Sequence, residues 1–185
     1  MNPIRELASY VRWVADSLPG SSGIHLRRLL SPVRGEKLIL NRWARVEGSV
    51  SIGENLMLAE RACLLAIGGR ATVGKNVAIG MNSLVSACDG GEIVIGNDVL
   101  IAQNVVIRAA DHRFDDLHSP IRTQGHVAGR ITIGNDVWIG ANCVVTAGAD
   151  IGDSSVIGAG AVVTGTIPPF SIAAGAPARV IRTRA

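Results

Sequence analysis

The side chains that could do chemistry near neutral pH gather in one short stretch of this 185-residue sequence. Three of its four histidines are His112, His118 and His126. An imidazole changes its charge near neutral pH, so histidine is well suited to take a proton from a reacting group. Most histidines in polar loops are solvated and inert. The residues alone therefore make this stretch a candidate for a general base and nothing more.

The three cysteines, Cys63, Cys88 and Cys143, indicate less chemistry. Their number is odd and no Cys-x-x-Cys spacing occurs, so neither a disulfide framework nor a thiolate metal site is indicated. We expect reduced thiols and no metal requirement.

Composition narrows the functional classes. Hydrophobic residues make up 48% of the chain and the mean hydropathy is +0.32, which fits one domain with a core. A net charge of +3 and a pI near 9.1 favour an anionic partner. Aromatic residues are only 3%, which argues against nucleic acid. No apolar run reaches the ~20 residues that span a bilayer, and no signal peptide is evident. We therefore expect a soluble, cytoplasmic protein.

The histidine-rich stretch interrupts a regular repeat. Aliphatic residues recur at every sixth position: Ile52, Leu58 and Leu64; Val73, Ile79 and Val85; Ile95, Ile101 and Ile107; and Ile133, Ile139, Val145, Ile151, Ile157 and Val163. Glycine often follows them, and a second small or apolar residue comes four positions later. An amphipathic helix needs apolar positions three and four apart, and interior glycines cost about 1 kcal/mol each. The spacing instead predicts a solenoid of stacked coils, with short strands and tight corners.

The coils are predicted to differ in length. Their first strands begin at Ile52, Val73, Ile95, Ile133 and Ile151, which gives separations of 21, 22, 38 and 18 residues. Each excess over 18 falls between the third strand of one coil and the first strand of the next, at 67–70, 88–91 and 109–130. A solenoid accepts insertions only where its ladders stay intact, so we expect all three at one corner, where functional loops would gather. We call residues 109–130 the excursion loop.

The two ends of the chain do not follow the repeat. Residues 1–45 are predicted to form a helical capping segment, because Asn2 and Pro3 resemble an N-cap and first turn. A short basic stretch at 24–30 would make at most weak contact with a membrane surface. Residues 46–166 are predicted to form the solenoid, and residues 167–185 a tail that caps its last coil.

Several segments also match a known pattern. They are Ile95-Gly-Asn-Asp-Val-Leu-Ile-Ala-Gln-Asn, Asp111-His112, Ile133-Gly-Asn-Asp-Val-Trp-Ile-Gly, Val156-Ile-Gly-Ala-Gly-Ala-Val-Val-Thr and Gly175-Ala-Pro-Ala-Arg. Over about residues 50–182 the sequence resembles the hexapeptide-repeat acyltransferases, especially the galactoside, maltose and nodulation-sugar O-acetyltransferases. Its leading segment resembles that of surface-polysaccharide acetyltransferases. The resemblance implies an all-β fold, a left-handed parallel β-helix of about five triangular coils. It also implies a homotrimer with active sites between subunits.

The resemblance further implies a reaction. It makes the chain an acetyl-CoA-dependent O-acetyltransferase that acts on a hydroxyl of a sugar or glycan, as in surface polysaccharide or lipopolysaccharide biosynthesis. His112 matches the family's catalytic histidine and would act as the general base in a direct transfer, with a backbone N–H stabilising the oxyanion. His118 and His126 are interpreted as surface or lining residues, and a lesser role in acceptor binding is the alternative. Cys143 occupies an inward repeat position, so we expect it in the core.

The acceptor site is marked less clearly. The resemblance places an acceptor-binding asparagine near Asn82, although an asparagine that satisfies backbone groups at a corner explains this residue equally well. Asp111, Asp115 and Asp116 could orient the imidazole or bind sugar hydroxyls. Asp115 is the preferred candidate, and the alternative is that all three are merely solvated.

Contacts with acetyl-CoA are implied at Trp138, Ala141, Ala159, Thr164, Arg179 and Arg182. Backbone and hydroxyl groups would hold the pantetheine, and the arginines would meet the phosphates. Trp138 is nearly as well explained by packing at a subunit interface, and the arginines by a solvated basic tail. Many relatives carry a lysine where this chain has Gly165, so Arg184 is a candidate replacement.

Other functions stay open as alternatives. Acetylation of an amino sugar, of serine or of an antibiotic would use the same base and cleft. A non-enzymatic solenoid scaffold is less favoured. A γ-type carbonic anhydrase needs three zinc-binding histidines on adjacent coils, whereas three histidines here share one loop. The residues before the first coil are too few for a nucleotidyltransferase domain.

Overall fold

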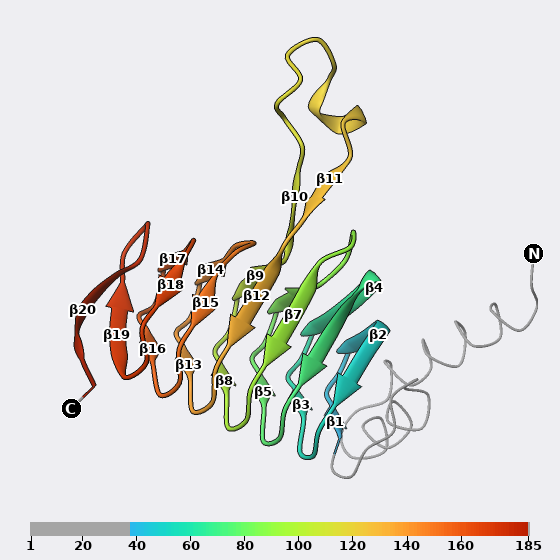
Figure 1. The fold of residues 1–185 in the computed structure, drawn as a ribbon. Coiled ribbons are helices and arrows are strands. Elements are labelled where there is room, and N and C mark those ends of the chain that lie inside the picture. Colours follow the sequence, from blue (N-terminus) through green and yellow to red (C-terminus); the bar gives the residue numbers. More distant parts are fainter. Residues whose placement is uncertain (1–37, 185) are drawn as a thin grey trace, which may run out of the picture.

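Short strands wind into a solenoid with three faces. The computed structural model describes residues 38–184, which contain strands β1 to β20 and one 3-10 turn. Each full turn of the chain contributes one strand segment to each face, and the turns stack side by side (Figure 1). Of the helical capping segment predicted for residues 1–45, residues 1–37 lie outside the described residues. The prediction is wrong for residues 38–45, which contain β1 and the start of β2 and no helix. Within residues 38–184, no helix is long and apolar enough to cross a membrane.

Seven parallel strands form the first face. They are β1 (Ile39–Leu40), β3 (Met57–Leu58), β5 (Ala78–Ile79), β8 (Leu100–Ile101), β13 (Trp138–Ile139), β16 (Val156–Ile157) and β19 (Ser171–Ala174).

A second sheet bends to supply the other two faces. The second face contains the first parts of β2 (Arg45–Ile52) and β4 (Cys63–Val73), then β6 (Leu84–Ser86), β9 (Val106–Arg108), β14 (Val144–Val145) and β17 (Val162–Val163). The third face contains the last parts of β2 and β4, then β7 (Glu92–Ile95), β12 (Arg130–Ile133), β15 (Asp150–Ile151) and β18 (Thr166–Ile167). We call the junction of the first and second faces the first corner, that of the second and third faces the second corner, and the remaining one the third corner.

The solenoid has about six turns rather than the five that the sequence predicts. The additional turn comes first: β1 pairs in parallel with β3, and β2 with β4. Leu40, Val46 and Ile52 keep the six-residue spacing in this turn. Asn41 and Glu47 stand where later turns often have corner glycines, so the glycine pattern did not reveal it.

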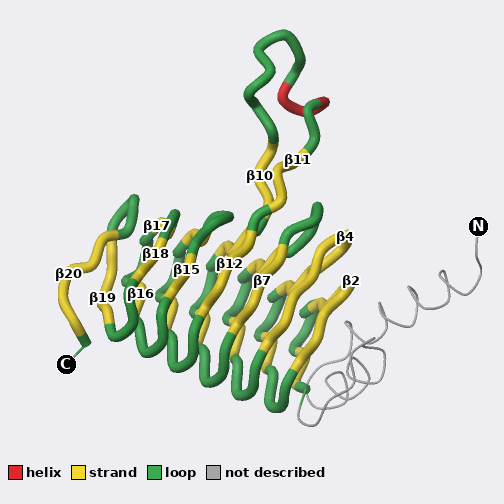
Figure 2. The backbone as a smooth tube through the Cα atoms, viewed as in Figure 1, coloured by secondary structure: helices red, strands yellow, loops and turns green. Residues whose placement is uncertain are grey.

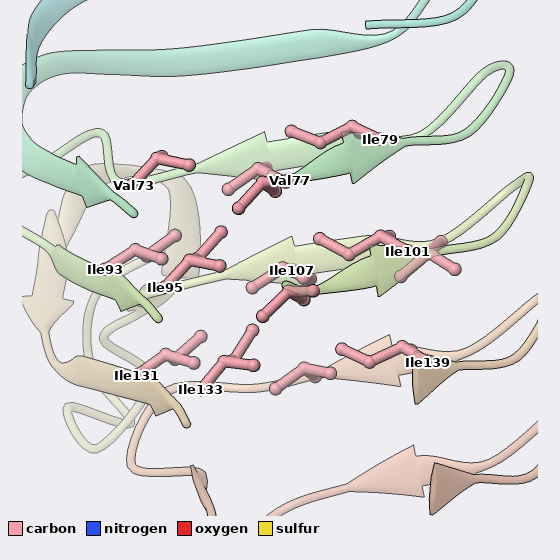
Figure 3. Close-up of a cluster of buried hydrophobic side chains, with 14 of the residues drawn as sticks. Val73, Val77, Ile79, Ile93, Ile95, Ile101, Ile107, Ile131, Ile133 and Ile139 are labelled. Carbon is pink, nitrogen blue, oxygen red and sulfur yellow. The ribbon is translucent and has the colours of Figure 1, made fainter. Parts of the chain in front are cut away.

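Aliphatic side chains from successive turns form ladders inside the solenoid. Val73 pairs in register with Ile95, and Ile95 with Ile133, and each is at most 2% exposed. Figure 3 shows these ladders beside Ile93 and Ile131. Burial of such a side chain contributes about 1.5–3 kcal/mol. The predicted second inward positions are also buried: Val77, Ser83, Val99, Val105, Val137, Cys143, Ala149, Ser155 and Ala161.

Glycine is required where successive turns touch at the third corner. A Cβ added to Gly74 would lie 2.5 Å from the backbone oxygen of Gly96, and one added to Gly96 would lie 2.7 Å from that of Gly134. These separations are far below van der Waals contact. A side chain there would push neighbouring turns apart, so the glycine spacing in the sequence reflects their close approach.

All three insertions lie at the second corner, as the spacing predicts. Residues 67–70 remain within β4, residues 88–91 join β6 to β7, and the excursion loop joins β9 to β12. The excursion loop leaves the coils as an antiparallel pair, β10 (Ala110–His112) and β11 (His126–Ala128), with a 3-10 turn at Ile121–Thr123. Figures 1 and 2 show it projecting well beyond the neighbouring corners.

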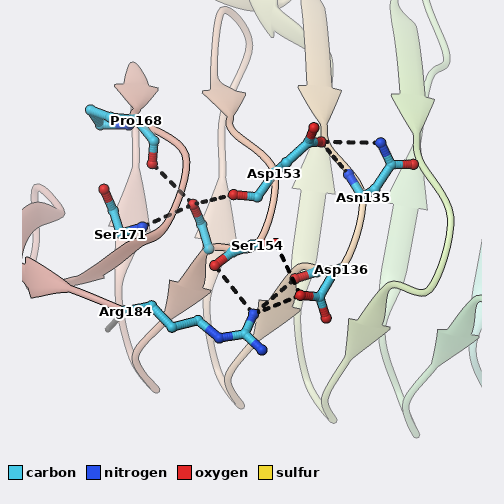
Figure 4. A network of polar contacts seen from close by, with 8 residues as sticks. Asn135, Asp136, Asp153, Ser154, Pro168, Ser171 and Arg184 are labelled. Atoms are coloured by element: carbon cyan, nitrogen blue, oxygen red, sulfur yellow. Dashed lines mark hydrogen bonds and ion pairs between the residues drawn. The ribbon is translucent and has the colours of Figure 1, made fainter.

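The chain reverses direction at its end. β20 (Arg179–Thr183) pairs with β19 in antiparallel orientation, so the parallel stacking stops there. Beyond β20, Nη1 of Arg184 lies 2.8 Å from the Asp136 carboxylate and donates to the carbonyl oxygen of Ser154 at 3.2 Å. Figure 4 shows this network at the third corner. The final residues are thereby joined to two coils.

Candidate active site

The base of the excursion loop is fixed to the coils. Ala109 and Ala110 are fully buried. The backbone N–H of Ala109 donates to the carbonyl of Ser86 at 3.0 Å, and that of Gly129 donates to the carbonyl of Ala109 at 2.8 Å. His112 follows on β10 and is exposed. Its backbone position is therefore set by paired strands close to the coils.

His112 and His126 lie directly opposite each other in the β10–β11 pair. Their ring centroids are 4.3 Å apart and the ring planes are inclined by 35°. Directly opposed residues of an antiparallel pair project from the same side, so the register brings the two rings into contact. The sequence predicts His126 only as a surface or lining residue, so its pairing with His112 was not predicted.

Asp89 and Arg108 extend the histidine pair into a line of polar side chains. Nε2 of His126 is 3.9 Å from Oδ2 of Asp89, and Nη2 of Arg108 is 2.9 Å from the same oxygen. Nη1 of Arg108 also donates to the hydroxyl of Ser86 at 3.3 Å. We call His112, His126, Asp89 and Arg108 the polar line. Its inner members come from neighbouring coils.

Asp89 was not among the predicted site residues. It lies in the insertion at 88–91 with a φ of 58°, a left-handed conformation that aspartate tolerates better than most residues. The N–H of Asp89 donates to the carbonyl of Ile67 at 3.2 Å, so the turn rests on the coil before it. The signal was present in the sequence, because Cys88-Asp-Gly-Gly forms an insertion at the same corner as the excursion loop.

Gln124 and Asp116 hold the tip of the excursion loop together. Nε2 of Gln124 donates to the carbonyls of Asp116 and Ser119 at 2.8 Å each, and the N–H of Asp116 donates to Oε1 of Gln124 at 3.1 Å. The Ser119 hydroxyl and the backbone N–H of His118 hold the pKa of the Asp116 carboxyl below its ordinary value. Asp116 therefore shapes the loop, and His118 takes part through its backbone.

Asp111 and Asp115 lie outside the polar line. Oδ2 of Asp115 is 3.5 Å from Nη1 of Arg113, and its Oδ1 accepts a hydrogen bond from the N–H of Phe114 at 3.2 Å. Asp111 is exposed on β10. Acceptor binding by Asp115 stays a prediction.

Asn82 lies at the first corner, whereas the polar line lies at the second. It has a φ of 57°, and its Nδ2 donates to Oδ1 of Asn104 at 3.3 Å. Asn104 and Asn142 adopt the same left-handed conformation at this corner in later turns, with φ of 57° and 58°. Corner geometry thus accounts for Asn82, and its acceptor-binding role stays a prediction.

Three of the expected acetyl-CoA positions follow the first corner. Ala141 and Ala159 occupy adjacent turns, and the N–H of Gly160 donates to the carbonyl of Ala141 at 2.8 Å. Arg179 begins β20 opposite Ala174, where β19 reaches the same corner. The exposed Arg179 guanidinium therefore lies at the end of a stack of backbone groups, an arrangement that suits a ligand with a polar arm and phosphates.

The other three expected contacts with acetyl-CoA do not lie at the first corner. Trp138 projects from the first face with 52% of its surface exposed, in a shallow cleft that Asp136 and Arg184 also line. Thr164 follows β17 at the second corner, and Arg182 is exposed on β20.

One chain does not bring the expected acetyl-CoA positions of the first corner to the polar line. The second face separates the two corners by roughly 16 Å, the length of about five extended residues. In one chain, the expected acetyl-CoA positions of the first corner therefore lie apart from His112.

Cys143 lies in the core, as predicted, and is fully buried. Its Sγ is 3.1 Å from the carbonyl oxygen of Gly158, and burial raises the pKa of the thiol. Within the described part of the chain, no group of three or more histidine, cysteine, aspartate or glutamate side chains could hold a metal ion.

A protein-family model described as bacterial transferase hexapeptide (six repeats) matches residues 130–165. These residues run from β12 to just beyond β17 and include the most regular coils.

Curated relatives match longer or more similar stretches. Putative acetyltransferase SAV2555 of Staphylococcus aureus is 42% identical over 116 residues, which cover 62% of this chain and 56% of that protein. Galactoside O-acetyltransferase of Escherichia coli is 60% identical over 38 residues, which cover 20% of this chain and 19% of that protein. The chain thus spans about half the length of the first relative and less of the second.

Solved structures share the solenoid. The hexapeptide-repeat containing acetyltransferase VCA0836 from Vibrio cholerae, complexed with acetyl coenzyme A, has a TM-score of 0.61 and 25% identity, and the match covers 99% of this chain and 88% of that one. AntD, an N-acyltransferase from Bacillus cereus in complex with dTDP and 3-hydroxybutyryl-CoA, has a TM-score of 0.73 and covers 87% of each chain. Its identity of 21% limits that likeness to the fold.

Proposed function

We propose that this chain, which resembles the hexapeptide-repeat acyltransferases in its motifs and its coils, transfers an acetyl group from acetyl-CoA to a hydroxyl of a sugar or glycan. The observation that carries the proposal is the position of His112. It is exposed on the ordered base of the excursion loop, at the place that the resemblance gives to the catalytic base.

His112 would act as the general base. Its imidazole would accept the proton of the attacking hydroxyl while that oxygen bonds to the thioester carbonyl carbon. The C–S bond then breaks, and the leaving thiolate takes the proton back from the imidazole. A backbone N–H would stabilise the oxyanion between these steps. This direct transfer would acylate no residue of the chain, and the inward-facing Cys143 is fully buried.

The cosubstrate would lie along the first corner. Backbone groups at Ala141 and Ala159 would hold the pantetheine arm. Thr164 lies at the second corner, so its hydroxyl would reach a cosubstrate bound between this chain and a neighbouring copy. Arg179 and Arg182 would meet the phosphates, because a guanidinium makes strong charge-assisted hydrogen bonds to phosphate oxygens. The support for this placement is the exposure of both arginines on β20.

The site would be completed in a homotrimer of left-handed coils, with His112 of one copy beside the first corner of the next. Outward-pointing side chains support such an assembly. They include Leu100 and Trp138 on the first face and Val106 on the second face, which are 55%, 52% and 37% exposed, whereas Thr72 and Asp150 project from the third face. Two different apolar faces suit a contact that closes a ring of identical copies.

Release of coenzyme A tests the proposal. The wild-type protein is mixed with acetyl-CoA and with methyl galactoside, glucosamine or serine, and free thiol is measured with a chromogenic reagent. We expect thiol release and an acetyl ester with the hydroxyl sugar. An acetamide formed from glucosamine would instead identify an amino-sugar N-acetyltransferase.

Matched variants identify the base. His112→Ala should lower turnover by about 10²–10⁴-fold, the usual contribution of general base catalysis. His118→Ala, in the same loop, should keep wild-type turnover. Full turnover in His112→Ala would remove the assignment of His112. A wild-type protein that binds acetyl-CoA but releases no thiol with any of the acceptors would favour a scaffold.

A further inference from the structure

We infer that His126 and Asp89 are positioning residues that hold the imidazole of His112 in its reactive orientation. The inference rests on the proposed function, because it gives His112 the role of general base. Its evidence is separate, since it comes from the geometry of the polar line. Neither residue touches the reacting atoms in this mechanism, and each acts through His112.

The ring of His126 limits the conformational freedom of His112. His112 is on an exposed strand, where its side chain would otherwise sample several staggered rotamers. The ring of His126, with its centroid 4.3 Å away, restricts this freedom on one side. Misplacement of a catalytic group by about 1 Å can cost about 100-fold in rate, so a neighbour that removes unproductive rotamers matters for turnover.

The ring of His126 is oriented in turn by groups outside the excursion loop. The excursion loop alone does not fix this ring, because residues 113–125 form a long projection beyond it. Asp89 comes from a different insertion, and its carboxylate lies 3.9 Å from Nε2 of His126. Asp89 is held in turn at 2.9 Å by Arg108, which is on β9 directly before the loop. The rigid coils therefore set the orientation of His126.

The contact between His126 and Asp89 contributes little to the stability of the fold. The side chains of His126 and Asp89 are 30% and 37% exposed. A contact between polar side chains with such exposure usually contributes no more than about 1 kcal/mol to stability. The coils already bury continuous aliphatic ladders, so the loss of this contact should barely change the thermal midpoint. Its effect should instead appear in kcat.

The experiment compares His126→Ala, Asp89→Asn and the double variant with the control His118→Ala, using acetyl-CoA and the best acceptor among methyl galactoside, glucosamine and serine. Asparagine tolerates the left-handed conformation of residue 89, so Asp89→Asn removes the charge and keeps the turn. Each single variant should lose about tenfold to 100-fold in kcat, with the KM for acetyl-CoA and the thermal midpoint unchanged. Because both act through His112, the double variant should fall little further than the worse single one.

Three results would overturn the inference: wild-type kcat in His126→Ala, multiplied losses in the double variant, or a fall in thermal midpoint that accounts for the lost activity. A readout without turnover separates this inference from the proposed function. Nuclear Overhauser contacts between the imidazole protons of His112 and His126 should be present in the wild type and weakened in Asp89→Asn. Their persistence in Asp89→Asn would refute the role of Asp89 even if no acceptor is found.

Discussion

The guanidinium of Arg184 lies 2.8 Å from the carboxylate of Asp136, although 48 residues separate them in the chain. Arg184 is the candidate replacement for the lysine that many relatives carry at the position of Gly165. Its guanidinium is instead paired with Asp136. Thr164 and Gly165 lie at the second corner, whereas Arg184 is bound at the third. The structure therefore makes Arg184 a poor substitute for that lysine.

The three arginines near the C-terminus should consequently differ in function. Arg179→Ala and Arg182→Ala should each raise the KM for acetyl-CoA by about 10-fold to 150-fold, because a hydrogen bond to a charged group contributes about 1.5–3 kcal/mol. Arg184→Ala should leave this KM unchanged and lower the stability by no more than about 1 kcal/mol, as expected for an exposed ion pair. Steady-state kinetics and thermal melts measure both effects. An equal rise in KM for Arg184→Ala would contradict the assignment.

A corner glycine should matter more for stability than a glycine in open space. Gly96→Ala would place a Cβ 2.7 Å from the backbone of Gly134 in the next turn, so we expect a loss of about 1–3 kcal/mol through overpacking. Gly165→Ala is the matched control, because nothing lies within 4 Å of its added Cβ. Its effect should stay within about 0.5 kcal/mol. Thermal unfolding compares the two, and equal midpoints would show that the coils relax around the added methyl group.

The sequence predicts the coils well because their determinants are periodic. Ile95 and Ile133 must both face inward, and the six-residue spacing follows directly from that requirement. Gly74 and Gly96 mark the corners because the turns touch there. The first turn was not predicted because it lacks part of this pattern. Leu40 keeps the six-residue spacing, but Asn41 occupies the position of a corner glycine.

The partners of His112 could not be predicted from spacing. Its contact with His126 depends on the register of β10 and β11, which a long loop of irregular sequence separates. Asp89 approaches because two insertions of different length meet at one corner. Neither contact produces a periodic pattern in the sequence. The sequence therefore favoured Asp115, which is nearer to His112 in the chain. In the structure, Asp115 pairs with Arg113.

The buried thiol of Cys143 should be the least reactive of the three cysteines. Burial raises its pKa above the ordinary 9.0, whereas Cys63 and Cys88 are only partly buried. Since the thiolate is the nucleophile, iodoacetamide should label Cys88 and Cys63 in the folded protein well before Cys143. Mass spectrometry of the labelled peptides measures this order. Labelling of Cys143 as fast as Cys88 without unfolding would contradict its place in the core.

The same shift predicts how stability depends on pH. Because the folded-state pKa of Cys143 is raised, the unfolded chain releases the thiol proton first as the pH rises above 9.0. The folded state then binds more protons than the unfolded state, so the free energy of unfolding falls with rising pH. Cys143→Ala should lack this part of the decline. Denaturant unfolding at pH 8 and at about pH 10 should show a smaller fall for the variant than for the wild type or Cys88→Ala.

Glycine substitutions can separate the two interpretations of Asn82. Asn82→Gly keeps the left-handed corner without strain, because glycine adopts positive φ freely, and it removes the amide. Asn142→Gly makes the same change at the same corner two turns later. If Asn82 binds the acceptor, only Asn82→Gly should raise the KM for the acceptor several-fold, while the KM for acetyl-CoA and the thermal midpoint stay near wild type in both variants. Identical kinetics in the two variants would leave Asn82 as a corner residue alone.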